Sequence, residues 1–545
     1  MLSLLQVLGL ALPLLNGVAA RGRASDPTAT IKNGTYAGKY VRSLKQDVFL
    51  GIPFAQPPVG ELRFRNPQPL NESFTETRDA KEYGDSCVGY GNSEDWPHTM
   101  SEDCLTLNIV RPTGYSEGDK LPVAVFIHGG GYSMDYSANG VYNLSFIVQE
   151  STRMHKPIIA ASMDYRLSGW GFLGSQEAVD AGVANLGLKD QRLSLYWIAE
   201  NIAAFGGDPS KVTIFGESAG GHSVASQALA YGGVDDGLFR AMIIQSAGGG
   251  PRGPDLTTYT ARYNRLAADV GCDGDDKLDC LRRVPFDALN AAIANSTSGF
   301  GPVYDGDFIR GSNGKQLREG NYVKVPLLIG TNADEGTLFA GSPMNSDEEI
   351  ALYLAGLGYD DDEINVLIHL YPNIDAIGLP REFRNPPNST RGSMYKRFIS
   401  LFTDHAFHAF RRYATEAWSD AGLPVYSYLF DSTLPARPEM GAAHWFEIPY
   451  VFNNILGLGM QAISPFATGD KDRIALARLM TRMWVSFVHD LDPNNHGVPS
   501  VDSWPLYNAT GGYGDNFYFH PTEVGTQPDT LRLAGTTFIN SVLMK

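Results

Sequence analysis

Short apolar runs that end in glycine or in a polar turn recur along the chain. Between them lie two stretches, 194–205 and 222–230, whose apolar residues have the spacing of a helix. Unbroken apolar strands that alternate with helices are typical of a mostly parallel sheet covered by helices on both faces. The pattern therefore predicts an α/β fold whose functional groups gather at the carboxyl ends of the strands. The predicted strands and the turns that follow them cover residues 121–131, 156–166, 211–215, 239–249, 325–336 and 424–431.

Composition and charge narrow the possible architecture and partners. The 545 residues are 43% hydrophobic and 19% charged, which is typical of a globular protein with a large core. No linker, charge block, low-complexity tract or repeat divides the chain, so we expect residues 21–545 to form a single domain. A net charge of −17 without any cluster of Lys and Arg argues against nucleic acid and strongly anionic membranes as partners. The oligomeric state is not predictable from the sequence.

The first twenty residues, MLSLLQVLGLALPLLNGVAA, have the pattern of a signal peptide. Val18 and Ala20 fit the −3 and −1 positions of a cleavage site, although the segment before the apolar run carries little charge. A membrane anchor is the alternative, but Pro13 and the short apolar length oppose it. We therefore expect a secreted, extracellular protein without an integral membrane anchor.

Cysteine and asparagine usage agrees with secretion. The cysteines number four, and pairing sequence neighbours predicts the disulfides Cys87–Cys104 and Cys272–Cys280. A cytosolic protein with free thiols is the alternative. Six Asn-x-Ser/Thr triplets predict a glycoprotein. The acceptor residues are Asn33, Asn71, Asn143, Asn295, Asn388 and Asn508.

The sequence GESAG, residues 216–220, follows one predicted strand and precedes one predicted helix. Glycines at both ends remove side chains that would collide across a very tight turn. Ser218 then lies at the tip of the turn, with its hydroxyl exposed and the amino end of the helix directed at it. A small-residue turn that lets a helix pack closely on a sheet is the alternative, and the partners of the serine decide between the two.

A serine hydroxyl is a poor nucleophile without a base, and its reaction needs donors where the tetrahedral oxyanion forms. The sequence HGGGY, residues 128–132, ends the first predicted strand. The expected donors are the amides of Gly130 and Gly131, together with that of Ala219 after the serine. A plain glycine loop is the alternative, but it does not explain why this loop lies at a strand end upstream of the serine turn.

Several longer stretches carry a resemblance to a known family, among them GTNADEGTLF (330–339) and MGAAHWFEIPYVF (440–452). The others are residues 49–64, 101–112, 185–221 and 243–248, of which 185–221 is the longest and most specific. The chain resembles the type B carboxylesterase family, which includes cholinesterases and secreted fungal lipases. This resemblance covers nearly the whole mature chain and implies an α/β-hydrolase fold.

The resemblance also supplies the partners of the serine. It implies Glu335 as the acid of a Ser-Glu-His triad, although the adjacent Asp334 is chemically competent. It implies His444 as the histidine, with His489 and His128 as the next candidates. His444 would take the serine proton and return it to the leaving alcohol, while Glu335 would orient the imidazole.

Further residues match supporting positions of the family. Glu217 and Ser246 resemble residues that support the triad by hydrogen bonding, and Arg63 and Glu102 resemble a structural salt bridge. No metal or organic cofactor is expected, because the sequence has no HExxH motif and no metal-spaced cysteine set. The expected partner is a small-molecule or lipid ester.

The chain departs from the family in ways that bear on the substrate. Only sixteen residues lie between Cys87 and Cys104, a loop that is long in cholinesterases and forms a lid in the lipases. A loop this short favours soluble short- to medium-chain or small aromatic esters, unless another segment, such as 380–395, forms a lid. Trp96 in this loop raises choline esters as a minor alternative. Asp164 stands where the family usually has asparagine.

Three functions follow from these observations. The leading hypothesis is a secreted serine carboxylesterase. The second is a lipase or sterol esterase that acts on long-chain lipid esters at interfaces. The third is a non-enzymatic adhesion or receptor domain, which the presence of the serine, acid, histidine and glycine loop opposes.

Overall fold

The computed structural model describes most of the chain after the predicted signal peptide. Residues 1–25, which contain that peptide, lie outside the described part, and so do Trp96 and Asn388. The described residues are 26–91, 99–247, 256–296, 299–341, 343–384, 390–435, 437–460 and 464–544.

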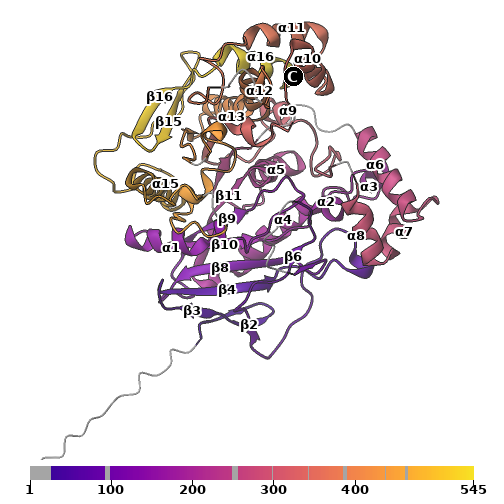
Figure 1. Cartoon of the computed structure of the whole chain (residues 1–545). Helices are drawn as coiled ribbons and strands as arrows, with labels where there is room; N and C mark the ends of the chain where they lie inside the picture. Colours follow the sequence, from indigo (N-terminus) through magenta and orange to yellow (C-terminus); the bar gives the residue numbers. More distant parts are fainter. Residues whose placement is uncertain are drawn as a thin grey trace, which may run out of the picture.

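A large twisted sheet runs through the described part of the chain and contains eleven strands (Figure 1). In spatial order they are β16 (Glu523–Pro528), β15 (Asp515–His520), β14 (Val425–Phe430), β13 (Leu327–Asn332), β12 (Ala241–Gln245), β11 (Gly207–Glu217), β9 (Leu121–Ile127), β10 (Ile159–Met163), β8 (Thr106–Pro112), β4 (Gln46–Pro53) and β3 (Lys39–Val41). The strands from β15 to β10 pair in parallel. Antiparallel strands extend both edges. The prediction of a mostly parallel sheet is confirmed.

Helices cover both faces of this sheet because its central strands are apolar on both sides. In β9, Val123 and Val125 face one buried cluster while Ala124 and Phe126 face the other. The first cluster includes side chains of α4 (Leu186–Asn201) and α5 (Ala219–Gly233), and the second those of α1 (Leu144–Arg153) and α15 (Lys471–Asp490). Figure 1 shows the two helix layers on opposite sides of the strands.

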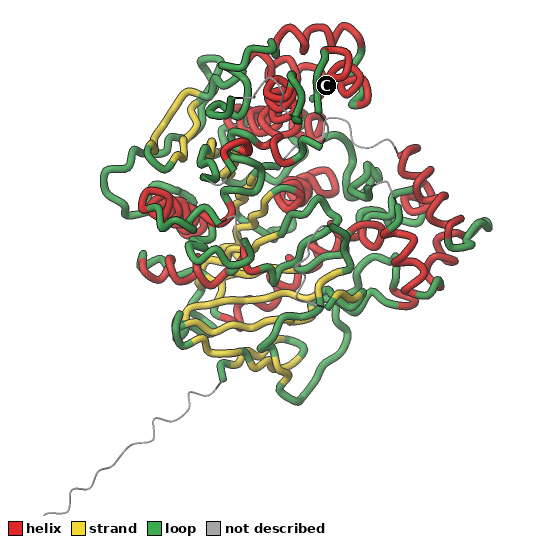
Figure 2. Tube along the Cα trace, viewed as in Figure 1, coloured by secondary structure: helices red, strands yellow, loops and turns green. Residues whose placement is uncertain are grey.

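The remaining elements are excursions from this core (Figure 2). Short strands form two small sheets: β1 (Thr28–Ile31), β2 (Gly34–Ala37) and β5 (Arg78–Asp79), and β6 (Ser86–Cys87) with β7 (Met100–Ser101). Helices at the periphery are α2 (Ser168–Gly171), α3 (Gln176–Asp180), α6 (Leu256–Asp269), α7 (Lys277–Arg283), α8 (Phe286–Ala294) and α9 (Asn313–Arg318). Besides α15, the α- and π-helices after β13 are α10 (Asp347–Gly356), α11 (Asp361–Leu370), α12 (Tyr395–Thr403), the π-helix Asp404–His408, α13 (Ala409–Asp420), α14 (Ile448–Val451) and α16 (Leu533–Leu543).

Covalent and ionic links hold the excursions in place. Both predicted disulfides, Cys87–Cys104 and Cys272–Cys280, are formed. Arg63 and Glu102 make the expected salt bridge through two hydrogen bonds of 2.6 and 2.7 Å. None of the helices in the described ranges is both long and apolar enough to span a bilayer.

Candidate active site

Ser218 occupies the turn between β11 and α5. Its backbone has φ 57° and ψ −124°, a combination that non-glycine residues rarely adopt. The neighbouring glycines make this turn possible: a Cβ on Gly216 would lie 2.5 Å from the backbone of Gly220. A Cβ on Gly220 would lie 2.0 Å from the carbonyl oxygen of Ile127. The predicted strand–serine–helix turn is therefore present, and its glycines have the predicted steric reason.

The glycine loop after β9 lies directly against this turn. A Cβ on Gly129 would come within 3.1 Å of the Cβ of Ser218, so the backbones approach as closely as glycine allows. Gly130 and Gly131 have φ of 86° and 61°, a region that favours glycine. No backbone carbonyl in the described ranges accepts a hydrogen bond from the amides of Gly130, Gly131 or Ala219. These amides are therefore free to bind an oxygen atom.

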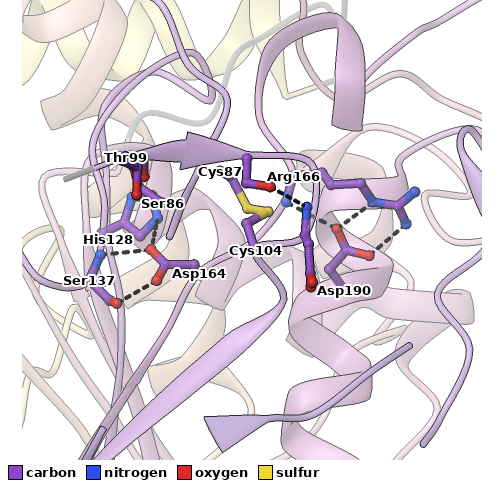
Figure 3. Close-up of a disulfide and its surroundings, with 11 residues drawn as sticks. Ser86, Cys87, Thr99, Cys104, His128, Ser137, Asp164, Arg166 and Asp190 are labelled. Carbon is purple, nitrogen blue, oxygen red and sulfur yellow. Dashed lines mark hydrogen bonds and ion pairs between the residues drawn. A yellow bond between two sulfur atoms is a disulfide. The ribbon is translucent and has the colours of Figure 1, made fainter. Parts of the chain in front are cut away.

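Asp164, the residue that departs from the family pattern, fixes the chain at Ser137, a few residues after the glycine loop. Its buried carboxylate accepts hydrogen bonds from the Ser137 amide (2.8 Å) and the Ser137 hydroxyl (2.6 Å). Figure 3 shows this pair, with His128, on one side of the Cys87–Cys104 disulfide and the Arg166–Asp190 pair on the other. A carboxylate suits two donors because both of its oxygens accept. Burial raises the pKa of Asp164.

Glu335 and His444 are in close polar contact. The Nδ1 atom of His444 lies 2.6 Å from Oε2 of Glu335, and both side chains are buried. The other carboxylate oxygen of Glu335 accepts a hydrogen bond of 2.7 Å from the amide of Asn332 at the end of β13. The expected acid and histidine, from segments more than a hundred residues apart in sequence, thus meet in the structure.

The other sequence candidates do not contact this pair in the same way. Asp334 turns toward the histidine loop, where Oδ2 accepts a hydrogen bond of 2.8 Å from the amide of Ala442. Burial, followed by the charge of Asp431, raises the pKa of Asp334 to about 7. His489 pairs with its neighbour Asp490 at the end of α15, and His128 lies near Asp164.

The second nitrogen of His444 faces the serine turn. Its Nε2 atom lies 3.2 Å from Oε1 of Glu217, the residue before Ser218, and makes no hydrogen bond within the described part of the chain. The hydrogen bond between Ser218 and His444 is therefore not formed in this structure; such bonds are often long without substrate. Burial, followed by the charges of Glu447 and Glu335, raises the pKa of Glu217 well above its usual range.

Glu447 completes the cluster of carboxyl groups around His444, and the sequence reasoning missed it. It is fully buried and accepts hydrogen bonds from Asn332 (2.7 Å) and Gln245 (3.3 Å). Burial, followed by the charge of Glu335, raises the pKa of Glu447 to about 7. The available signal was its place three residues after His444 in the matching stretch 440–452.

Ser246, the other expected supporting residue, is buried at the end of β12. Its amide donates to the Gly330 carbonyl (2.9 Å), but its hydroxyl has no partner in the described residues. Phe339 and Phe407 place their rings 5.0 and 4.9 Å from the imidazole of His444. Since Phe339 is 45% exposed, the approach to the histidine is partly apolar.

Comparison with known proteins gives consistent matches. A family model described as "Carboxylesterase family" matches residues 25–527. Lipase 4 of Diutina rugosa is 35% identical over 97% of this chain and 97% of that protein. Secreted lipase 1 of Botryotinia fuckeliana (strain B05.10) is 34% identical over 93% of this chain and 94% of that protein.

Solved structures agree with the sequence relatives. The crystal structure of Aspergillus niger EstA has a TM-score of 0.82 at 27% identity and covers 95% of this chain and 98% of its own. The Geobacillus stearothermophilus carboxylesterase EST55 has a TM-score of 0.78 at 28% identity, with 93% of this chain and 99% of its own covered. The expected α/β-hydrolase fold is confirmed.

Proposed function

The chain belongs to the carboxylesterase family and is a carboxylic ester hydrolase, and we propose that it acts through an acyl-enzyme on Ser218. The observation that carries this proposal is the 2.6 Å contact between His444 and Glu335, with Nε2 of the imidazole 3.2 Å from Glu217 of the serine turn and without a hydrogen bond in the described residues. An imidazole that a carboxylate holds at Nδ1, and whose Nε2 lies at the serine turn without a hydrogen bond, is arranged as a general base.

In this proposal His444 removes the proton of Ser218 as the hydroxyl attacks the ester carbonyl. The imidazolium then returns the proton to the leaving alcohol, and water hydrolyses the acyl-enzyme by the same route. The amides of Gly130, Gly131 and Ala219 would bind the oxyanion, and the absence of a backbone acceptor for them among the described residues supports this. The buried Glu335 would orient the imidazole and stabilise its charged form.

We propose soluble short- to medium-chain or small aromatic esters as the substrates. The short loop closed by Cys87–Cys104 supports this, because it offers little chain to cover a deep acyl pocket. The curated relatives named as lipases favour the second candidate, a lipase or sterol esterase for long-chain esters. The minor alternative, a choline ester, depended on Trp96, which lies outside the described residues.

We further propose that residues 1–20 are a signal peptide, that 21–545 form a single domain, and that the protein is secreted. The two disulfides and the secreted lipase among the relatives support this. Amino-terminal sequencing of the protein from culture medium tests the cleavage after Ala20.

An acyl-chain-length profile tests the function and the substrate class together. The secreted protein and the Ser218→Ala blank are assayed on nitrophenyl esters from acetate to palmitate, below and above their solubility limits. We expect a peak at about two to six carbons with no increase on emulsification. A peak at about twelve carbons or more, with such an increase, would favour the lipase. If wild type and blank gave equal rates on every ester, the serine mechanism would be wrong.

A further inference from the structure

A π-helix lies against the turn that carries Glu335. Asp404–His408 joins α12 to α13 and opens one wide turn within a continuous helix. Hydrogen bonding from residue i to residue i+5 adds a residue to the turn, so residues five apart share a face. Thr403 and His408 are five apart, and Phe407 between them packs its ring 4.9 Å from that of His444. π-turns within helices are frequent at functional sites.

Thr403 and His408, on this shared face, contact both ends of the turn that carries Glu335, residues 332–336, which we call the acid turn. The hydroxyl of Thr403 accepts a hydrogen bond of 3.0 Å from the amide of Gly336, just after Glu335. Nε2 of His408 lies 2.9 Å from the carbonyl oxygen of Asn332, just before it. Because a carbonyl oxygen only accepts, Nε2 of His408 carries the proton in this contact.

The other ring nitrogen of His408 contacts a buried carboxylate. Its Nδ1 atom lies 3.1 Å from Oδ1 of Asp404, a fully buried carboxylate. Arg532 donates two hydrogen bonds, of 2.6 and 2.7 Å, to Asp404, and Tyr371 donates a third of 2.8 Å. Three hydrogen bonds therefore fix the carboxylate that contacts the ring of His408.

Asn332 connects His408 to Glu335 and to the loop that carries His444. Its amide donates to Oε1 of Glu335 (2.7 Å), whose other oxygen contacts His444. Its side chain donates to the carbonyl of Ala443, the residue before the histidine (2.7 Å). We infer that His408 is a positioning residue, which holds Asn332 and through it keeps Glu335 aligned with His444. This inference rests on the proposed function.

The same π-helix contains a matched control. His405 is buried like His408, but its Nδ1 atom lies 2.8 Å from the hydroxyl of Tyr359. In the described part of the chain its imidazole therefore bonds to the loop between α10 and α11 and not to the acid turn. Replacing either histidine removes a buried hydrogen bond from the same element, and His408 loses its contact with Asp404 as well, so kcat and not stability distinguishes the two variants.

The test compares kcat and KM for a soluble nitrophenyl ester in His408→Leu, His408→Gln and His405→Leu, with Ser218→Ala as the blank. We expect His408→Leu to lower kcat about tenfold with KM nearly unchanged, because the acid is misplaced while the ester site is intact. His408→Gln, whose amide can donate from the place of Nε2, should recover kcat to within about threefold of wild type. His405→Leu should keep the wild-type kcat.

Equal kcat values for His408→Leu and His405→Leu would overturn the inference, as would a His408→Gln variant no faster than His408→Leu. If His408→Leu does not fold, His408→Phe, which keeps a flat aromatic ring without a donor, takes its place. A wild type no faster than Ser218→Ala would instead overturn the proposed function, so the two failures are distinguishable.

Discussion

Asp334 and Glu335 are adjacent carboxylic acids with different partners, and this difference is testable. Glu335 contacts the imidazole of His444, whereas Asp334 accepts from the backbone amide of Ala442. Glu335→Gln should lower kcat by about a thousandfold or more, because an amide cannot hold the imidazolium and favours the wrong tautomer. Asp334→Asn keeps an oxygen acceptor for Ala442, so its kcat should stay within about tenfold of wild type. Steady-state kinetics on a soluble ester measure both values, and a reversed order would show that Asp334 is the triad acid.

The sequence predicted the residues that we propose to react more fully than the residues that hold them. Ser218, Glu335 and His444 lie in short motifs whose spacing has a local mechanical reason. Glu447 and His408 contact Asn332, which is distant from both in sequence. Their place in the site depends on how β13, the loop that carries His444 and the π-helix pack together. No local sequence pattern predicts this packing.

At the scale of elements, the serine turn depends on how closely α5 and β9 approach. A Cβ at Gly220 would meet the Ile127 carbonyl at 2.0 Å, whereas a Cβ at Gly131 meets nothing within 4 Å. Gly220→Ala should therefore destabilise the fold by more than about 2 kcal/mol, because backbone must move. Gly131→Ala should cost about 1 kcal/mol, from its φ of 61° alone. Urea unfolding of both variants measures the difference, and equal midpoints would contradict this packing.

The hydrophobic pattern predicted the centre of the sheet and not its edges. The predicted strands correspond to β9–β14, which are buried on both faces and hence continuously apolar. β16 has the sequence EVGTQP and no fully buried residue, so its apolar content does not distinguish it from a loop. Such a strand is defined by the antiparallel partner beside it, β15.

At the scale of the molecule, exposure separates the predicted glycosylation acceptors. Asn71, Asn295 and Asn508 are exposed, while Asn33 uses its side-chain amide to donate to the Glu72 carbonyl at 2.7 Å. Because a glycan is attached to that nitrogen, we expect glycans at the three exposed residues and not at Asn33. Asn143 caps α1 through its side-chain oxygen, and Asn388 lies outside the described residues. Glycopeptide mapping of the secreted protein measures occupancy, and full occupancy of Asn33 would contradict this expectation.

Buried carboxyl groups of two kinds set the pH dependence of stability. Burial alone would raise the pKa of Asp404, but the Arg532 guanidinium outweighs it and holds this pKa well below its usual range. Arg411 and Arg412 do the same for the pKa of Asp529. A lowered pKa contributes stability that is present above the unfolded value, about 4, and is lost as the pH falls. These ion pairs therefore stabilise the fold at all but acidic pH.

Asp334 and Glu447 act in the opposite direction. Burial raises the pKa of each to about 7. Their contribution to the free energy of unfolding is therefore complete below the pKa of the unfolded state, and it is lost as the pH rises from there through 7. Self-repulsion from a net charge of −17 adds to this loss. The melting temperature should therefore be highest near about pH 5 and fall toward both pH 3 and pH 8. In Glu447→Gln the decline on the alkaline side should be shallower, because one of the buried carboxyl groups with a raised pKa no longer ionises. A wild-type melting temperature that rises from about pH 5 to 8 would mean that these carboxyl groups ionise in the folded protein without cost.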